Sequence, residues 1–187
     1  MLIKICGIKR LEDIEYVNEL KPDYIGFVFA KSKRQIDIYK AIELKDHLDS
    51  KIKVVGVFRN DNIDLIKEVL SYNIIDLIQL HGDESDDYIK EIKKITNKPI
   101  IKAYRDSEYA KYSLYDSLEP GQGIEFDYKS VKSHKQYFLA GGINISNIDE
   151  ALKQNPYCID VSSGVETDGI KDYYKMKELI KRCKNYE

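Results

Sequence analysis

The sequence has almost no excess of charge of either sign. Its 30 basic and 32 acidic residues leave a formal net charge of −2. Proteins that bind nucleic acid or an anionic membrane surface need a basic excess to attract the phosphates. We therefore expect neither kind of partner. A local site for a single phosphate group remains compatible with this balance, because a few donors are enough to form it.

Cysteine is scarce and scattered along the chain. Cys6, Cys158 and Cys183 lie far apart, and the sequence contains no CxxC pair and no cluster of Cys and His. These absences argue against a disulfide framework and against a zinc site. We expect no bound metal.

Long apolar runs and interdomain linkers are also missing. No run approaches the about 20 residues that a membrane-spanning helix needs. The first residues enter a strand directly and do not resemble a signal peptide, so we expect a cytoplasmic protein. No stretch rich in Pro, Gly or Ser divides the chain, and residues 1–187 are expected to form one domain.

Apolar runs of strand length recur along the whole chain. They are nearly continuous rather than alternating, which is typical of parallel strands covered on both faces. Eight such runs are present, at 2–6, 24–29, 53–58, 75–80, 99–103, 112–115, 137–140 and 158–161.

Segments with helical periodicity separate most of these runs. Apolar side chains recur at helical spacing within 11–20, 63–70, 89–95 and 173–180. Another helix is expected to follow Ser146 as its N-cap, and Asp127 suits the N-cap of a helix after the sixth strand. Only the fifth connection, residues 104–111, is too short for a helix with its loops.

Alternating strands and helices fold either as a doubly wound parallel sheet or as a closed barrel. Eight strand-helix units favour the barrel. We predict an α/β protein, a minimal single-domain (β/α)8 TIM barrel with a degenerate fifth helix.

Polar side chains follow the predicted strands at the points where the strands end. Cys6 closes the first strand, His81 follows the fourth, Asp116 follows the sixth, and Asp160 lies in the eighth. The carboxyl ends of parallel barrel strands meet at one rim, where barrel enzymes build their active sites. We therefore expect a site at this rim, although a buried cysteine by itself is more often a packing residue.

Small residues follow the last two strands. Gly141 and Gly142 come after the seventh strand, and Ser163 and Gly164 come after the eighth. Backbone N–H groups at such turns can converge on a phosphate, and barrels often place a phosphate at this position. The expected ligand is a phosphorylated small molecule.

Several motifs resemble the phosphoribosylanthranilate isomerase family of tryptophan biosynthesis. They include Lys4-Ile5-Cys6-Gly7, Gln79-Leu80-His81-Gly82 and Asp160-Val161-Ser162-Ser163-Gly164-Val165-Glu166, which occur in the family's order. The resemblance implies a (β/α)8 barrel and an Amadori rearrangement that needs no cofactor. In that reaction, an acid opens the ribosyl ring to a Schiff base, and a base then removes the C2′ proton.

The resemblance also implies residue roles. Cys6 would be the general base and Asp116 the general acid, with Arg34 clamping the anthranilate carboxylate and His81 and Gln79 binding substrate. A base must be deprotonated to accept a proton, so we expect the pKa of Cys6 to lie below its usual value of about 8.5. Asp116 must carry a proton to donate it.

Lys4 and Asp160 are expected to support Cys6. Side chains alternate along a strand, so Lys4 shares the inward direction of Cys6, about 6–7 Å away. The eighth strand closes against the first, which brings Asp160 within reach of Lys4. A buried lysine needs such a partner. We expect the pair to lie inside the barrel and Lys4 to favour the Cys6 thiolate.

The chain also departs from the family pattern and leaves alternatives open. The loop at 120–123 reads Pro-Gly-Gln-Gly and lacks the family's hydroxyl residue. The alternatives are a related phosphosugar isomerase of histidine biosynthesis, which would carry Asp in place of Cys6, and a non-catalytic barrel that binds a phosphorylated ligand. The short fifth unit could be covered by its own loop or by a second subunit, so a monomer and a homodimer both remain open.

Overall fold

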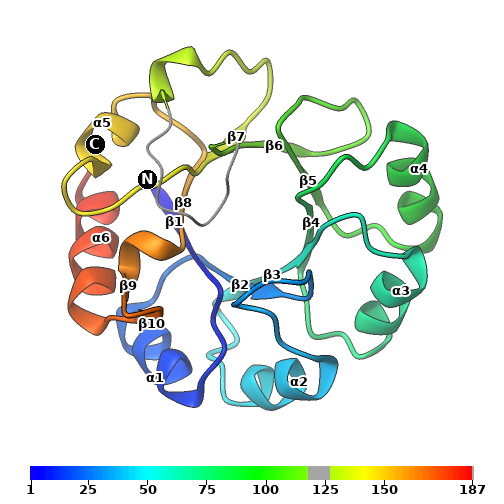
Figure 1. Cartoon of the computed structure of the whole chain (residues 1–187), viewed down its shortest axis with the longest axis horizontal. Coiled ribbons are helices and arrows are strands. Elements are labelled where there is room, and N and C mark those ends of the chain that lie inside the picture. Colours follow the sequence, from blue (N-terminus) through cyan, green and yellow to red (C-terminus); the bar gives the residue numbers. More distant parts are fainter. Residues whose placement is uncertain (118–126, 187) are drawn as a thin grey trace.

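The computed structural model describes residues 1–117 and 127–186, and the loop at 120–123 lies outside this range. Within it, eight parallel strands form a closed barrel, and the last strand returns to pair with the first (Figure 1). The predicted barrel is therefore confirmed. Its strands are β1 (Leu2–Cys6), β2 (Tyr24–Val28), β3 (Lys53–Phe58), β4 (Leu77–Leu80), β5 (Ile100–Ala103), β6 (Tyr112–Tyr115), β7 (Tyr137–Leu139) and β8 (Cys158–Val161).

Helices surround the barrel (Figure 1). They are α1 (Leu11–Leu20), α2 (Ile38–Asp46), α3 (Ile63–Ser71), α4 (Asp86–Ile95), α5 (Ile148–Leu152) and α6 (Tyr173–Asn185). The side chains of Asn62, Ser85 and Asp172 accept hydrogen bonds from backbone N–H groups in the first turns of α3, α4 and α6. Such caps stabilise a helix start by about 1 kcal/mol each. They also set where each loop at the carboxyl end of the barrel finishes.

Two helix starts differ from the sequence expectation. The N-cap of α5 is Asn147 rather than Ser146. The Ser146 backbone N–H instead donates to the Asn144 side chain at 2.8 Å, so this residue is still part of the preceding turn. Asp127 does cap a helical segment and accepts a hydrogen bond from the Lys129 N–H, but that segment is a single 3-10 turn, η1 (Tyr128–Ser130).

The fifth connection contains no helix, as predicted: residues 104–111, all of which the structure describes, form turns and bends. In Figure 1 the ring beyond α4, around β5 and β6, is accordingly covered by loops. Lys102 points outward from β5 under this arc and is buried. Its ammonium group donates to the Glu84 carboxylate at 3.1 Å and to the Gly82 carbonyl at 2.6 Å. A buried ion pair thus fills part of the space that a helix would cover.

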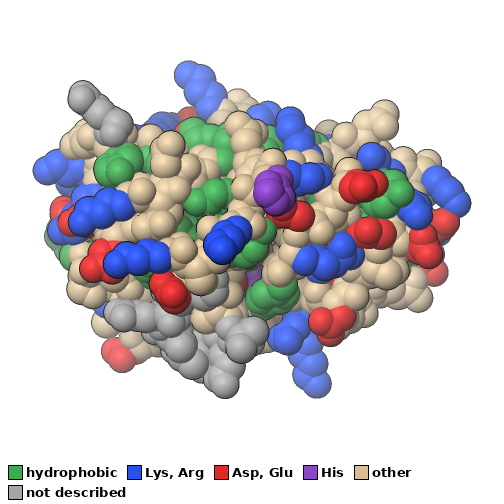
Figure 2. All heavy atoms as spheres, turned by 90° about the horizontal axis from the view of Figure 1, so that it is seen from above, with side chains coloured by type: hydrophobic (Ala, Val, Ile, Leu, Met, Phe, Trp, Pro, Cys, Tyr) green, Lys and Arg blue, Asp and Glu red, His purple; other side chains and the backbone are tan. Residues whose placement is uncertain are grey.

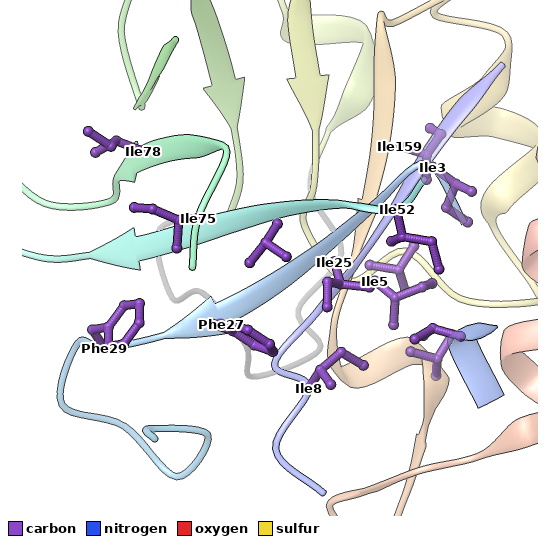
Figure 3. Close-up of a cluster of buried hydrophobic side chains, with 14 of the residues drawn as sticks. Ile3, Ile5, Ile8, Ile25, Phe27, Phe29, Ile52, Ile75, Ile78 and Ile159 are labelled. Carbon is purple, nitrogen blue, oxygen red and sulfur yellow. The ribbon is translucent and has the colours of Figure 1, made fainter. Parts of the chain in front are cut away.

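The apolar side chains form two layers. One layer lies between the strands and the helices, and Figure 3 shows part of it, where Ile3, Ile25 and Ile159 gather from β1, β2 and β8. The other fills the inside of the barrel and includes Val55, Val57, Leu77, Ile101, Leu114 and Phe138. Successive strand residues point to opposite faces. Burial of both faces therefore explains why the strands are apolar throughout.

The surface carries charges of both signs. Figure 2 shows acidic and basic side chains interspersed over one side of the molecule, in keeping with the small net charge. In the described parts of the chain, none of the helices combines the length and the hydrophobicity needed to cross a membrane.

We expect Lys102→Met to lower the free energy of unfolding by about 3–5 kcal/mol, because it leaves the Glu84 charge buried without its cation. Urea denaturation followed by circular dichroism measures this change. Lys67→Met is the matched control: Lys67 is half exposed and pairs with Asp64 on the surface of α3, and its loss should cost about 0.5 kcal/mol or less. Equal effects of the two substitutions would contradict a structural role for the buried pair.

Candidate active site

A cavity of about 150 Å³ opens at the carboxyl ends of the barrel strands. Nine residues that the sequence singled out line it, namely Cys6, Arg34, Gln79, His81, Asp116, Gly141, Gly142, Asp160 and Ser163. The remaining two, Lys4 and Gly164, lie outside the lining. Arg59 and Ser162 also line the cavity but received no role from the sequence. Their position directly after β3 and β8 is the signal that could have identified them.

Two glycines make room for Cys6 and Arg34. Gly26 is paired with Cys6 across β1 and β2, and a Cβ atom at Gly26 would lie 2.6 Å from the Cys6 sulfur. Gly7 follows Cys6 with a φ of +82°, and a Cβ atom there would lie 2.5 Å from the Arg34 side chain. Glycine at both positions therefore lets the thiol and the guanidinium approach the same part of the rim.

Lys4 and Asp160 pair inside the barrel, as expected from the sequence. Lys4 is fully buried, and its ammonium nitrogen lies 2.8 Å from Oδ2 of Asp160. Burial alone would lower the pKa of Lys4, but the interactions with Asp160 and Cys6 together outweigh it and raise that pKa, so the lysine stays charged. Oδ1 of Asp160 has no hydrogen-bond partner among the described residues.

The pKa of Cys6 does not follow the sequence expectation. We expected a lowered value, whereas burial raises the pKa of the thiol above its ordinary value, and the Asp160 charge adds to this. Lys4 and Lys171 oppose the shift but do not reverse it. The expectation took account of the Lys4 charge but not of the desolvation of the sulfur. In addition, Asp160 neutralises much of the Lys4 charge.

A second charged group holds Arg34. The Arg34 guanidinium donates through Nε and Nη2 to the two carboxylate oxygens of Glu166, each at 2.7 Å. Lys171, which is also buried, donates to Glu166 at 2.8 Å. Burial alone would raise the pKa of Glu166, but Arg34 and Lys171 outweigh it and lower that pKa to about 2. The sequence interpretation gave Glu166 and Lys171 no role.

Polar contacts also run along the cavity wall toward Asp116. The Lys4 ammonium donates to Oε1 of Gln79 at 2.7 Å, and Nε2 of Gln79 lies 2.7 Å from Nδ1 of His81. Nε2 of His81 lies 3.3 Å from Oδ2 of Asp116. That last contact is close enough for an ion pair, but its geometry is not that of a hydrogen bond.

The glycines of the expected phosphate site have different environments. Gly141 and Gly142 have φ values of +96° and +66°, a region that favours glycine, and both line the cavity. Gly164 packs against the loop after β7, where a Cβ atom would lie 1.9 Å from the Ile143 carbonyl oxygen. The close packing of Gly164 holds the loops after β7 and β8 together.

The cavity thus combines a thiol, a carboxyl group and a fixed guanidinium in one small space. Proton transfer between a bound molecule and side chains on different strands is the chemistry that these groups can perform. In residues 1–117 and 127–186, no group of three or more His, Cys, Asp or Glu side chains is arranged to hold a metal ion.

Residues 3–182 match the family model of N-(5′-phosphoribosyl)anthranilate isomerase. The chain belongs to this family. Its sequence is 46% identical over 192 residues to the protein of that name from Endomicrobium trichonymphae, covering 96% of each chain. It is 44% identical to the one from Clostridium acetobutylicum, with 99% of this chain and 98% of the relative covered.

Solved structures from the family share this fold. The phosphoribosyl anthranilate isomerase from Thermus thermophilus superimposes with a TM-score of 0.90 at 31% identity, over 100% of both chains. Another family structure, in complex with reduced 1-(o-carboxyphenylamino)-1-deoxyribulose 5-phosphate, gives a TM-score of 0.84 at 33% identity, over 98% of each chain.

The raised pKa of Cys6 predicts how its alkylation should depend on pH. We expect the rate of modification by iodoacetamide to rise with a midpoint above that of an ordinary exposed thiol, because burial raises the pKa of Cys6 and the thiolate is the reactive form. Asp160→Asn should move the midpoint down, since it removes a negative charge that raises the pKa. Peptide mass spectrometry measures each thiol separately, so the fully buried Cys158 and Cys183 are internal controls. A wild-type midpoint at or below that of a free cysteine in the same buffer would contradict the raised pKa.

Proposed function

We propose that this protein converts N-(5′-phosphoribosyl)anthranilate into 1-(2-carboxyphenylamino)-1-deoxyribulose 5-phosphate in tryptophan biosynthesis. The observation that carries the proposal is that Cys6, at the end of β1, and Asp116, directly after β6, line the same cavity. The rearrangement needs a proton donor at the ring oxygen and a proton acceptor at C2′ of one small sugar. Two groups from different strands can approach that sugar from different directions.

The acid and base roles follow the order of the chemistry. Asp116 gives its proton to the furanose ring oxygen, the bond from that oxygen to C1′ breaks, and the nitrogen lone pair forms the Schiff base. Cys6 then removes the C2′ proton in its thiolate form, which its raised pKa makes the less abundant form near neutral pH, and the electron pair moves toward nitrogen to give an enolamine. Tautomerisation of the enolamine yields the ketone product, with no cofactor involved.

Arg34 is proposed to bind the anthranilate carboxylate. Its Nε–H and one N–H of Nη2 donate to Glu166, and Arg34, unlike Glu166, lines the cavity. The remaining N–H groups of the guanidinium are therefore the ones available to a ligand. Glu166 and Lys171 fix the orientation of the guanidinium, which reduces the conformational entropy that it loses on binding.

The substrate phosphate is proposed to bind at the loops after β7 and β8. Gly141, Gly142 and Ser163 line the cavity there, and glycine leaves their backbone N–H groups open to a ligand. His81 also lines the cavity, with its Nε2 atom 3.3 Å from Oδ2 of Asp116.

The alternatives from the sequence now carry different weight. A phosphosugar isomerase of histidine biosynthesis would need another group in place of the Cys6 thiol, and the family match favours the tryptophan enzyme. A non-catalytic barrel is tested by activity. Loss of anthranilate fluorescence, as freshly made phosphoribosylanthranilate is consumed in a coupled assay, measures turnover directly, and its absence would favour a binding protein.

The assembly and compartment are also proposals. One related structure is described as monomers derived from a dimeric phosphoribosylanthranilate isomerase of Thermotoga maritima. We propose that this chain acts as a monomer or a homodimer in the cytoplasm, with a phosphorylated small molecule as its ligand. Sedimentation equilibrium distinguishes the two states.

We expect Cys6→Ala and Asp116→Asn each to lower kcat by about 10² or more, because each removes one group that transfers a proton. Steady-state fluorescence assays measure the change, and circular dichroism checks that each variant is folded. Cys183→Ala is the matched control, since it removes a buried thiol outside the cavity and should retain near-normal kcat. Near-normal turnover by either folded active-site variant would remove that residue from the mechanism.

Arg34→Ala should raise KM by about 10- to 100-fold, the range expected when about 1.5–3 kcal/mol of charge-assisted hydrogen bonding is lost. Glu166→Gln should raise KM less, because the guanidinium remains but is held by fewer charge-assisted contacts. Arg182→Ala, which removes an arginine paired with Glu178 on α6, is the control and should leave KM unchanged. An unchanged KM in Arg34→Ala would refute the carboxylate-binding role.

A further inference from the structure

A chain of polar contacts crosses the cavity wall from one carboxylate to another. It runs from Asp160 through Lys4, Gln79 and His81 to Asp116, with successive distances of 2.8, 2.7, 2.7 and 3.3 Å. The proposed mechanism uses only Asp116 from this set as a group that transfers a proton. The contacts of Lys4, Gln79 and His81 determine which atoms of the Gln79 amide and of the His81 ring carry hydrogen.

The orientation of the Gln79 amide follows from the charge of Lys4. An ammonium group has three donors and no acceptor, so only the carbonyl oxygen of an amide can face it. Lys4 is fully buried, but Asp160 and Cys6 together raise its pKa against the effect of burial, so it remains charged. Oε1 of Gln79 therefore points to Lys4, and the NH2 group points to His81.

The orientation of Gln79 in turn decides the protonation of His81. An amide NH2 group can only donate, so Nδ1 of His81, at 2.7 Å, must accept. A proton on Nδ1 would place two N–H groups against each other. The imidazole is therefore neutral and carries its single ring proton on Nε2. The His81 ring also packs edge-on against Tyr104, with the ring centroids 5.3 Å apart, which restricts its rotation.

The Nε2 atom of His81 lies close to the acid of the proposed mechanism, although the two groups do not form a hydrogen bond in this structure. Nε2 is buried and, among the described residues, has no hydrogen-bond partner, while Oδ2 of Asp116 lies 3.3 Å away. Oδ1 of Asp116 already accepts a hydrogen bond from the Ser117 N–H at 2.7 Å. The Nε2–H group of His81 is therefore a hydrogen-bond donor next to Oδ2 of Asp116.

We propose that Gln79 is a positioning residue that holds His81 as the neutral Nε2–H tautomer, so that His81 can stabilise the Asp116 carboxylate formed during ring opening. Asp116 gives its proton to the ring oxygen and is left with a negative charge. The Nε2–H group then donates a hydrogen bond to that charge and keeps its own proton. This inference rests on the proposed function, and it gives Gln79 a role other than the direct substrate contact expected from the sequence.

The tautomer can be measured without substrate by ¹⁵N NMR of histidine-labelled protein. The chain has three histidines, so the spectrum is simple, and His81→Asn assigns the His81 signals. We expect Nδ1 of His81 to show the shift of an unprotonated ring nitrogen and Nε2 that of a protonated one. His47 is an internal reference of the opposite kind, because its Nδ1 faces the Glu43 carbonyl oxygen at 2.9 Å and must donate. A protonated Nδ1 in His81 would overturn the proposal.

Gln79→Glu tests whether residue 79 controls the tautomer. A carboxylate can only accept, so it should force a proton onto Nδ1 of His81, and the Nδ1 shift should change accordingly. Gln154→Glu, the same substitution two residues beyond the end of α5, is the matched control and should leave the His81 signals unchanged. An Nδ1 that stays unprotonated in folded Gln79→Glu would overturn the proposal.

Kinetics distinguish positioning from substrate contact. We expect Gln79→Met and Gln79→Glu to lower kcat about tenfold or more, as for the loss of one hydrogen bond to a charged group, with KM changed less than twofold. A raised KM with normal kcat would mean that Gln79 binds substrate directly and would overturn the positioning role. Since the NMR result needs no turnover, an inactive wild-type protein would refute the proposed function while the tautomer could still be read.

Discussion

The buried pair of Lys4 and Asp160 is the interaction on which the rest of this structure depends. A charged lysine inside a barrel is strongly destabilising unless a carboxylate faces it. The pairing register of β1 with β8 places Lys4 beside Asp160, so closure of the barrel provides that carboxylate. The first and last strands are thus joined by an ion pair as well as by their backbone hydrogen bonds. Cys6 ends β1 two residues after Lys4. The ion pair of Lys4 and Asp160, which supports closure of the barrel, therefore also sets the charge near the Cys6 sulfur.

The charges around the cavity are arranged around two carboxylates. Lys4 is matched by Asp160, while Arg34 and Lys171 share Glu166, so the second group keeps one positive charge. Burial of the sulfur still outweighs the nearby cations and raises the pKa of Cys6. The ion pairs also keep each cation in a defined orientation. A fixed Arg34 can recognise a planar carboxylate, and a fixed Lys4 can orient Gln79. The charged groups therefore fix the orientations of the side chains around the cavity, in addition to setting its electrostatic potential.

The ring of helices is less complete than the barrel that it surrounds. The connection at 104–111 contains no helix, and in the described part of the next connection, residues 127–136, the only helical segment is the single turn η1. The strands there still pair with both neighbours, and the buried contact of Lys102 with Glu84 supports the loop outside them. A barrel strand obtains its backbone hydrogen bonds from the strands beside it, so the loss of an outer helix leaves the rim intact. The site residues on β4 and after β6 accordingly keep their positions.

The sequence by itself determined the barrel, the rim as the location of the site, and the pair of Lys4 with Asp160. Strand periodicity is a local pattern, and a barrel of eight parallel strands can close only by pairing β8 with β1, so these features could be predicted without knowing the packing. Tertiary structure decided the rest. The contact of Arg34 with Glu166 joins loops that are remote in sequence, and the orientation of Gln79 depends on Lys4 from another strand. The direction of the Cys6 pKa depends on how completely the folded chain excludes water from the sulfur. Burial and long-range contacts exist only once the chain has folded, and no local pattern encodes them.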